Sequence, residues 1–303
     1  MKYNPADEIL VTIGGSEAID AAIRALVSQG DEVIIPQPSY VCYEPITMLA
    51  GGIPVIIETK AENDFKITPE ELRAAITDKT KLLILPYPCN PTGAIMEKAD
   101  LTELSNVLKK TNIAVLSDEI YSELTYGDVK HVSPASIDGM WERTITVNGF
   151  SKAFSMTGWR LGYACGPREI MAQIIKIHQY AIMCAPTTSQ YAAIEALRNC
   201  DDDVENMHIE YDRRRKLIVK GFNDLGLTCR EPKGAFYAFP SIKSTGLSSD
   251  EFCEKLLKEK RVAVVPGTAF GKGGEGFIRA SYCYSPEHII KALERIKDFL
   301  YDL

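Results

Sequence analysis

The stretch EILVTIGGSEAIDAAIRALVSQGDEVIIP, residues 8–36, decides the fold class. Its first part, 8–13, is an apolar run with β-branched residues, which predicts a strand. Residues 16–28 have the pattern of a helix, and the apolar run 31–36 predicts a second strand. Strands that are apolar on both faces and are separated by helices are typical of a parallel sheet covered by helices.

The same alternation continues through the first half of the chain. Further strands are predicted at 53–59, 81–87, 112–118, 143–149 and 161–166, and helices at 68–76 and 98–111. We therefore predict an α/β fold with a mostly parallel, seven-stranded sheet covered by helices.

From residue 167 the pattern turns helical, over 167–184 and 187–225. Strand-like pieces then follow at 234–240, 262–267 and 276–282, with helices at 248–260 and 286–301. This predicts a larger domain, residues 1–190, and a smaller C-terminal α+β domain, residues 191–303. The charged run DRRRK, 212–216, is predicted to be a solvated helix face.

Composition excludes several classes of protein. The chain has 303 residues, 46% of them hydrophobic, and a net charge of −7, which argues against a partner such as nucleic acid or an anionic membrane. No run approaches a membrane span, and the N-terminus lacks an apolar signal core. Eight cysteines without CxxC spacing and four isolated histidines give no support to a metal site, and they predict reduced thiols in the cytoplasm.

Ligands of open parallel sheets gather where strands end. After the first strand, Gly14, Gly15 and Ser16 lead directly into a helix, and this arrangement suits a phosphate group. The alternative is an ordinary helix start with Ser16 as its N-cap. The stretch has neither GxGxxG nor GxxxxGK[ST], so a dinucleotide or nucleoside triphosphate is not indicated.

Three further strand ends carry polar or aromatic residues. Tyr40 follows a proline-rich turn and suits stacking on a planar ring or plain packing. Asn90 lies between two prolines, and either aims its amide at a ligand or forms a turn. Asp118 ends an apolar strand with Tyr121 three residues later. The carboxylate needs a partner, which is a cationic ring nitrogen or the start of the next helix, which Asp118 would cap.

Three cationic residues complete the set. Lys152, in SKAFSMTGWRLGY (151–163), follows a buried strand and is either a covalent catalyst or a solvated lysine. Arg160 lies eight residues later. Arg279, in an apolar strand-like run, needs an anion, and either a ligand carboxylate or an internal acid fits.

Together these residues describe one ligand. That ligand is pyridoxal 5′-phosphate. It has a phosphate, a planar ring, a ring nitrogen that needs a carboxylate, a phenolic oxygen and an aldehyde that needs an amine. The chain also resembles the class I aminotransferases of the aspartate aminotransferase superfamily, fold type I of the pyridoxal-phosphate enzymes. The resemblance covers nearly the whole chain and rests on TIGGSEAI, PSY, NPTG, SDEIYSEL, SKAFSMTGWRLGY, GAFYAFP, VVPGTAF and IRASY. The N-acetyl-diaminopimelate and aromatic aminotransferase branch is the most similar.

The resemblance implies a role for each residue. Lys152 forms the Schiff base and, as a neutral amine, carries a proton; its pKa is lowered by the cationic ring and Arg160. Asp118 holds the ring nitrogen protonated. The remaining assignments are Asn90 and Tyr121 on the phenolic oxygen, Tyr40 on the ring face, Gly15, Ser16, Glu17 and Arg160 on the phosphate, and Asn90 and Arg279 on the substrate carboxylate. A homodimer and a ping-pong transfer from an L-amino acid to a 2-oxo acid are also implied.

The chain departs from the family pattern in two places. Some relatives have a serine three residues before the lysine, where this chain has Gly149. Relatives also have a substantial segment before the first strand, so the chain is expected to be N-terminally truncated, with part of the small domain missing. The alternatives to an aminotransferase are a carbon–sulfur β-lyase on the same scaffold, an effector-binding module and an inactive truncated fragment.

Overall fold

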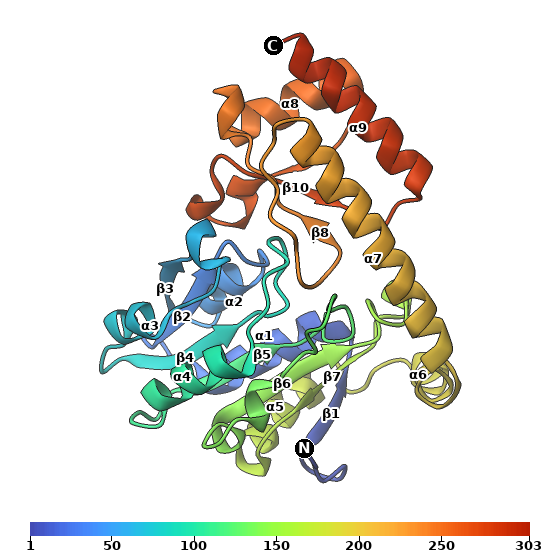
Figure 1. Ribbon diagram of the computed structural model, residues 1–303. Helices are drawn as coiled ribbons and strands as arrows, with labels where there is room; N and C mark the ends of the chain where they lie inside the picture. Colours follow the sequence, from blue (N-terminus) through green and yellow to red (C-terminus); the bar gives the residue numbers. More distant parts are fainter.

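The computed structural model describes all residues, 1–303. A seven-stranded sheet forms the lower part of Figure 1, in the order β1-β7-β6-β5-β4-β2-β3. Strands β2 to β6 are parallel, whereas β7 runs antiparallel to both β6 and β1. The strands are Ile9–Thr12, Glu32–Gln37, Ile53–Glu58, Thr80–Leu85, Ala114–Asp118, Thr144–Gly149 and Gly162–Cys165. The predicted mostly parallel sheet is confirmed.

Helices cover both faces of this sheet. On one face, α1 (Gly14–Leu26), α2 (Tyr43–Leu49) and α5 (Arg168–Ala181) pack on alternate strand residues such as Val33 and Leu116. On the other, α3 (Pro69–Ala75) and α4 (Lys98–Leu108) pack on the intervening ones. Because side chains alternate along a strand, both faces are apolar and the strand ends are left for chemistry.

The C-terminal part has its own core. The short strands β8 (Tyr237–Ala238), β9 (Val265–Pro266) and β10 (Ile278–Ser281) form an antiparallel sheet in the order β8-β10-β9. The helices around this sheet are α7 (Asp201–Asp224), α8 (Ser249–Lys260) and α9 (Pro286–Tyr301). The predicted helix 187–225 is interrupted at Cys200, which separates α6 (Thr187–Asn199) from α7. Figure 1 shows α7 running from the lower part to the upper part.

The prediction of a solvated DRRRK face is wrong for Arg215 and holds poorly for Arg214, whose side chain is only 20% exposed. Arg213 and Lys216 have exposed side chains, but Arg215 is buried. Its guanidinium pairs with Asp212 and Glu231, each at 2.6 Å, and lies 5.1 Å from the centre of the Tyr126 ring. A buried charge needs such partners, and Glu231 is too distant in sequence for a local charge pattern to indicate.

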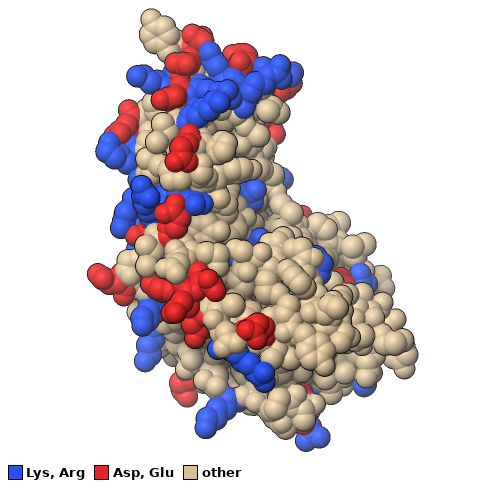
Figure 2. Space-filling model, turned by 90° about the vertical axis from the view of Figure 1, so that its right-hand side faces the viewer, with Lys and Arg blue, Asp and Glu red and all other residues tan.

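The surface charge and the cysteines do not point to a particular partner or metal. Figure 2 shows charges of both signs mixed over the upper part of one face, and a mostly uncharged area at lower right. All eight cysteines are free, and no group of three or more His, Cys, Asp or Glu side chains is placed to hold a metal. No helix has both the length and the apolar character that a membrane crossing requires.

Candidate active site

A cavity of about 310 Å³ opens where the parallel strands end. Its lining includes nine of the ten predicted site residues: Gly15, Ser16, Tyr40, Asn90, Asp118, Tyr121, Lys152, Arg160 and Arg279. Tyr43, Thr157 and Tyr237 also line it, and the sequence analysis did not single them out. Residues separated by up to 264 positions therefore meet in one place, because the strand ends of the parallel sheet and the C-terminal strands β8 and β10 line the same cavity.

A larger cavity, of about 460 Å³, lies among α7, α9 and β10. Its lining is mainly apolar, and Arg279 is the only predicted site residue in it. Convergent polar groups are what fix a ligand's orientation, so the smaller cavity is the better candidate for chemistry.

Asp118 is the buried acid of the site. One carboxylate oxygen accepts a 2.7 Å hydrogen bond from the Tyr43 hydroxyl, and the other accepts one from the main-chain N–H of Ile120 at 3.2 Å. Burial raises the pKa of Asp118, and the bond from Tyr43 partly offsets that rise. No helix directly follows β5, so the alternative that Asp118 caps a helix is wrong; the carboxylate accepts from the loop after β5 and also lines the cavity.

Lys152 follows β6 and is half-buried. Its amine lies 5.6 Å from the centre of the Tyr121 ring and 5.3 Å from that of Phe236. Burial is the largest cause that lowers the pKa of Lys152, and Arg160 is the weakest of the five causes. The direction is the one expected, but burial rather than the neighbouring arginine is its main cause.

Arg279 reaches the cavity from β10. Its Nη1 donates to the Asn90 side-chain oxygen at 2.9 Å, and its guanidinium lies over the Tyr237 ring at 4.4 Å. The Arg279 Nε is buried with no hydrogen-bond partner, and no acidic side chain pairs with this residue. The alternative of an internal acid partner is therefore wrong, and the Arg279 Nε is left as a donor without a partner.

At the start of α1 the backbone lies close to the Arg160 guanidinium. Gly14 has a φ of +71°, and a Cβ there would lie 2.6 Å from Arg160 Nη2. The N-cap is Ile13, without a side-chain cap bond, so the interpretation of Ser16 as an N-cap is wrong. The free N–H groups and the Arg160 guanidinium therefore form one anion-binding corner.

Glu17 corrects another prediction, because its side chain does not line the cavity. One carboxylate oxygen accepts a hydrogen bond from the main chain of Ile13, and the other lies 2.6 Å from His178 Nδ1. A negative charge is stabilised beside a helix N-terminus. Here the Glu17 carboxylate accepts from the main-chain N–H of the N-cap Ile13, which the helix leaves without a partner. The main-chain N–H of Glu17 makes the first intrahelical bond, to the carbonyl of the N-cap Ile13, so it is not free for a phosphate.

The absence of a serine at Gly149 has a steric reason. A Cβ at Gly149 would lie 2.9 Å from the Cα of Gly162 on the neighbouring strand β7. The side chain of Thr157, which lines the cavity, donates to the Ser151 carbonyl at 2.8 Å. A serine is therefore not tolerated at this position without a shift of β7.

We expect Gly14→Ala to weaken the binding of inorganic phosphate about tenfold, because the new methyl group displaces the Arg160 guanidinium. The positive φ also costs about 1–2 kcal/mol of stability. Gly30→Ala is the matched control: Gly30 has a φ of +88° and nothing within 4 Å of its added Cβ. Urea unfolding and phosphate titration of both variants separate strain from contact, and equal phosphate affinities would contradict the assignment.

We expect Tyr43→Phe to lower the free energy of unfolding by about 1–3 kcal/mol at pH 8, because the buried Asp118 carboxylate loses its donor. The loss of the donor raises the pKa of Asp118, so the cost shrinks as the pH falls and the carboxyl is protonated. Tyr87→Phe is the control, since the buried Tyr87 hydroxyl contacts only the uncharged main-chain groups of Phe65 and Ile67. The loss in free energy of unfolding caused by Tyr87→Phe should be the same at pH 8 and pH 5.

The site thus has three cations and one acid. Lys152, Arg160 and Arg279 form no ion pair with any acidic side chain of the chain, although Asp118 lines the same cavity. Like charges gathered without counter-charges favour an anionic ligand. The fold and this site are typical of α/β enzymes whose small-molecule ligands lie at the strand ends, and the three cations favour an anionic one.

Comparisons with known proteins identify the family. Residues 1–296 match the family described as "Aminotransferase class I and II", and the chain belongs to it. An aspartate aminotransferase of Pyrococcus abyssi is 49% identical over 302 residues, which are 99% of this chain and 78% of that protein. A Bacillus subtilis protein named "Probable N-acetyl-LL-diaminopimelate aminotransferase" is 45% identical over 298 residues, 98% of this chain and 75% of that protein.

Comparison with solved structures gives the same family as the sequence comparison. The crystal structure of an aromatic aminotransferase from Pyrococcus horikoshii has a TM-score of 0.97 and 47% identity, and covers 100% of this chain and 81% of that one. The resemblance inferred from the motifs is confirmed, and the protein is an aminotransferase. The relatives' names cover several substrates, so the family alone does not identify the amino donor.

Proposed function

We propose that this aminotransferase uses pyridoxal 5′-phosphate to move an amino group from an L-amino acid to a 2-oxo acid in ping-pong fashion. The observation that carries the proposal is the set of three cations without acidic partners around the single acid Asp118. The buried Nε of Arg279, which has no partner in the chain, gives independent support for an anion. When bound, the cofactor supplies an aldehyde that accepts an amino group and a ring that withdraws electrons.

The residues of the cavity fit this cofactor. The start of α1 and Arg160 would bind the phosphate, and Tyr40, half-buried beside Tyr43, would lie on the ring face. Asn90 and Tyr121 would donate to the phenolic oxygen. Both are buried, and the Tyr121 hydroxyl lies 3.2 Å from that of Tyr237.

Three further residues would hold the ring nitrogen, move the proton and bind the substrate: Asp118, Lys152 and Arg279. Asp118 would hold the proton on the ring nitrogen, since a buried carboxylate is stabilised by a cationic partner. Lys152, with its lowered pKa, would act as the amine that binds the aldehyde and then moves the substrate proton. Arg279 would bind the substrate carboxylate with both arms of its guanidinium, held in place by Asn90.

The test is direct. Purified protein is mixed with pyridoxal phosphate, its visible spectrum is recorded, and the adduct is reduced with borohydride and mapped. A yellow protein labelled on Lys152, and amino transfer that requires both an amino acid and a 2-oxo acid, support the proposal. Pyruvate release from cystathionine without an acceptor acid would instead support the β-lyase. A folded protein without any adduct would support an inactive fragment.

Three wider proposals follow from the family. A homodimer is supported by exposed apolar side chains on α5, α6 and the turn between them, among them Tyr180, Met183, Tyr191 and Leu197, exposed by 92, 77, 71 and 61%. The division into a cofactor-binding domain, 1–190, and a small domain, 191–303, is supported by the separate C-terminal core. A cytoplasmic location is supported by the free cysteines.

A further inference from the structure

A second buried carboxylate, Glu119, stands directly behind Asp118. The main-chain N–H of Glu119 still donates to the Val147 carbonyl at 2.8 Å, so the pleat of β5 continues and the two side chains point to opposite faces of the sheet. Glu119 is 3% exposed and does not line the cavity. It is therefore a buried acid that the proposed chemistry does not use.

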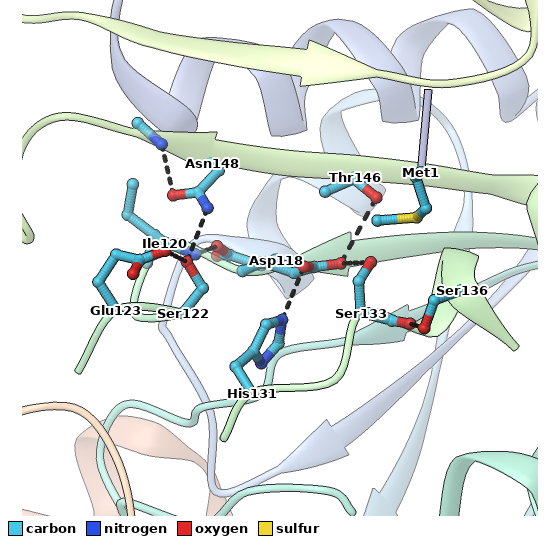
Figure 3. Close-up of polar contacts among 12 residues, drawn as sticks. Met1, Asp118, Ile120, Ser122, Glu123, His131, Ser133, Ser136, Thr146 and Asn148 are labelled. Atoms are coloured by element: carbon cyan, nitrogen blue, oxygen red, sulfur yellow. Dashed lines mark hydrogen bonds and ion pairs between the residues drawn. The ribbon is translucent and has the colours of Figure 1, made fainter. Parts of the chain in front are cut away.

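Three side chains converge on Glu119, and Figure 3 labels all three of them: His131, Ser133 and Thr146. His131 Nε2 lies 2.7 Å from one carboxylate oxygen, and the Ser133 hydroxyl donates to the other at 2.7 Å. Thr146 adds a longer bond of 3.4 Å from β6. His131 and Ser133 come from the loop after β5, and the side chain of His131 is itself largely buried, at 15% exposure.

His131 is the one hydrogen-bond partner of Glu119 whose side chain can carry a positive charge. The other titratable groups that face Glu119 are Asp118, Tyr3, Tyr163 and Cys165. Burial raises the pKa of Tyr163 and of Cys165 to about 12, and that of Tyr3 is also raised, so these three are neutral near pH 7. Histidine is the side chain that takes up a proton between about pH 8 and pH 5.

The Glu119 charge acts on Asp118. Burial is the main cause that raises the pKa of Asp118, and the Glu119 carboxylate raises it further because like charges oppose each other. A protonated His131, 2.7 Å away, would cancel that opposition by making the pair neutral.

We propose that Glu119 and His131 are positioning residues for the charge of Asp118, so that the protonation of His131 sets how firmly Asp118 holds a protonated ring nitrogen. The inference rests on the proposed cofactor. With His131 neutral, an uncompensated negative charge stands behind Asp118. With His131 protonated, the Glu119–His131 pair is neutral, and Asp118 keeps its own charge more readily.

A purely structural role for Glu119 would be to anchor the loop that carries His131 and Ser133. Two variants separate the roles. Glu119→Gln removes the charge but keeps an acceptor for Ser133. Ser133→Ala removes the 2.7 Å anchoring bond but keeps the charge. A charge effect follows the first variant only, and an anchoring effect follows the second variant only.

The binding test uses pyridoxal phosphate and an analogue in which carbon replaces the ring nitrogen. At pH 8 we expect Glu119→Gln to bind pyridoxal phosphate roughly tenfold more tightly than the wild type, and at pH 6 the difference should shrink. The carbon analogue should bind equally to both proteins at both pH values. His131→Gln should match the wild type at pH 8 and bind pyridoxal phosphate more weakly at pH 6. Equal effects on both ligands, or none, would overturn the proposal.

A second measurement needs no cofactor. Carbon-13 NMR of the Asp118 carboxyl, assigned with Asp118→Asn, follows its titration in the wild type, Glu119→Gln and Ser133→Ala. The pKa of Asp118 should fall in Glu119→Gln and stay unchanged in Ser133→Ala. An unchanged titration in Glu119→Gln refutes the charge coupling itself. A shifted titration in a protein that does not bind pyridoxal phosphate refutes the proposed cofactor instead.

Discussion

Lys152→Ala is expected to lose amino transfer by about 10³-fold or more, because the variant lacks both the amine that binds the aldehyde and the group that moves the proton. The lysine side chain is half-buried between the cavity and two aromatic rings, and its lowered pKa keeps a larger share of neutral amine than an ordinary lysine has. The measurements are turnover with an amino acid and a 2-oxo acid, and peptide mapping after borohydride reduction. No label should appear on the variant.

The control for this prediction is Lys176→Ala. Lys176 is exposed on α5 and contacts only the side chain of Gln173. The control should retain full turnover and the label on Lys152. Because truncation of a half-buried lysine can also change stability, urea unfolding of both variants accompanies the assay. Full activity of Lys152→Ala, or a label on another lysine, would contradict the assigned role.

Asp118→Asn is expected to bind pyridoxal phosphate roughly 10²- to 10³-fold more weakly, because removing one partner of a buried charge pair costs about 3–5 kcal/mol. The amide keeps the shape of the side chain and can still accept from Tyr43 and Ile120, so the change is mainly one of charge. Spectroscopic titration of the cofactor measures the effect. The carbon analogue of the cofactor should bind both proteins alike.

The free energy of unfolding of Asp118→Asn shows whether its weaker cofactor binding comes from misfolding. Since burial raises the pKa of Asp118, the ionised carboxylate is a cost to the fold that disappears as the pH falls through the folded-state pKa. Asp118→Asn should therefore be no less stable than the wild type at pH 8. Asp138→Asn is the control, because the Asp138 side chain is 96% exposed and should affect neither quantity. A strongly destabilised Asp118→Asn would contradict this account.

The sequence could predict the residues that follow strands. Asp118 ends one apolar, β-branched run and Lys152 lies three residues after another, so the end of each strand fixes their place at one edge of the sheet. Helix α2 was missed, because seven residues that include Pro45 give little periodic pattern. The interruption at Cys200 was missed because it has neither proline nor glycine to indicate it.

Partnerships across the sequence could not be predicted. Tyr43 meets Asp118 across 75 residues, and Arg215 meets Glu231 across 16. The 2.6 Å contact between Glu17 and His178 spans 161. These contacts depend on how elements pack rather than on local pattern. The ion-pair alternative for Arg279 was likewise open until β10 was placed against Asn90.

The gathering of Lys152, Arg160 and Arg279 without counter-charges also ties ligand binding to the thermodynamics of folding. Mutual repulsion among these cations opposes the compact state, and an anion that binds only the folded chain relieves it. By mass action, an anion present at 100 times its dissociation constant adds about 2.7 kcal/mol to the free energy of unfolding. The abundance of the folded enzyme would then follow the supply of its cofactor, and the melting temperature would report occupancy.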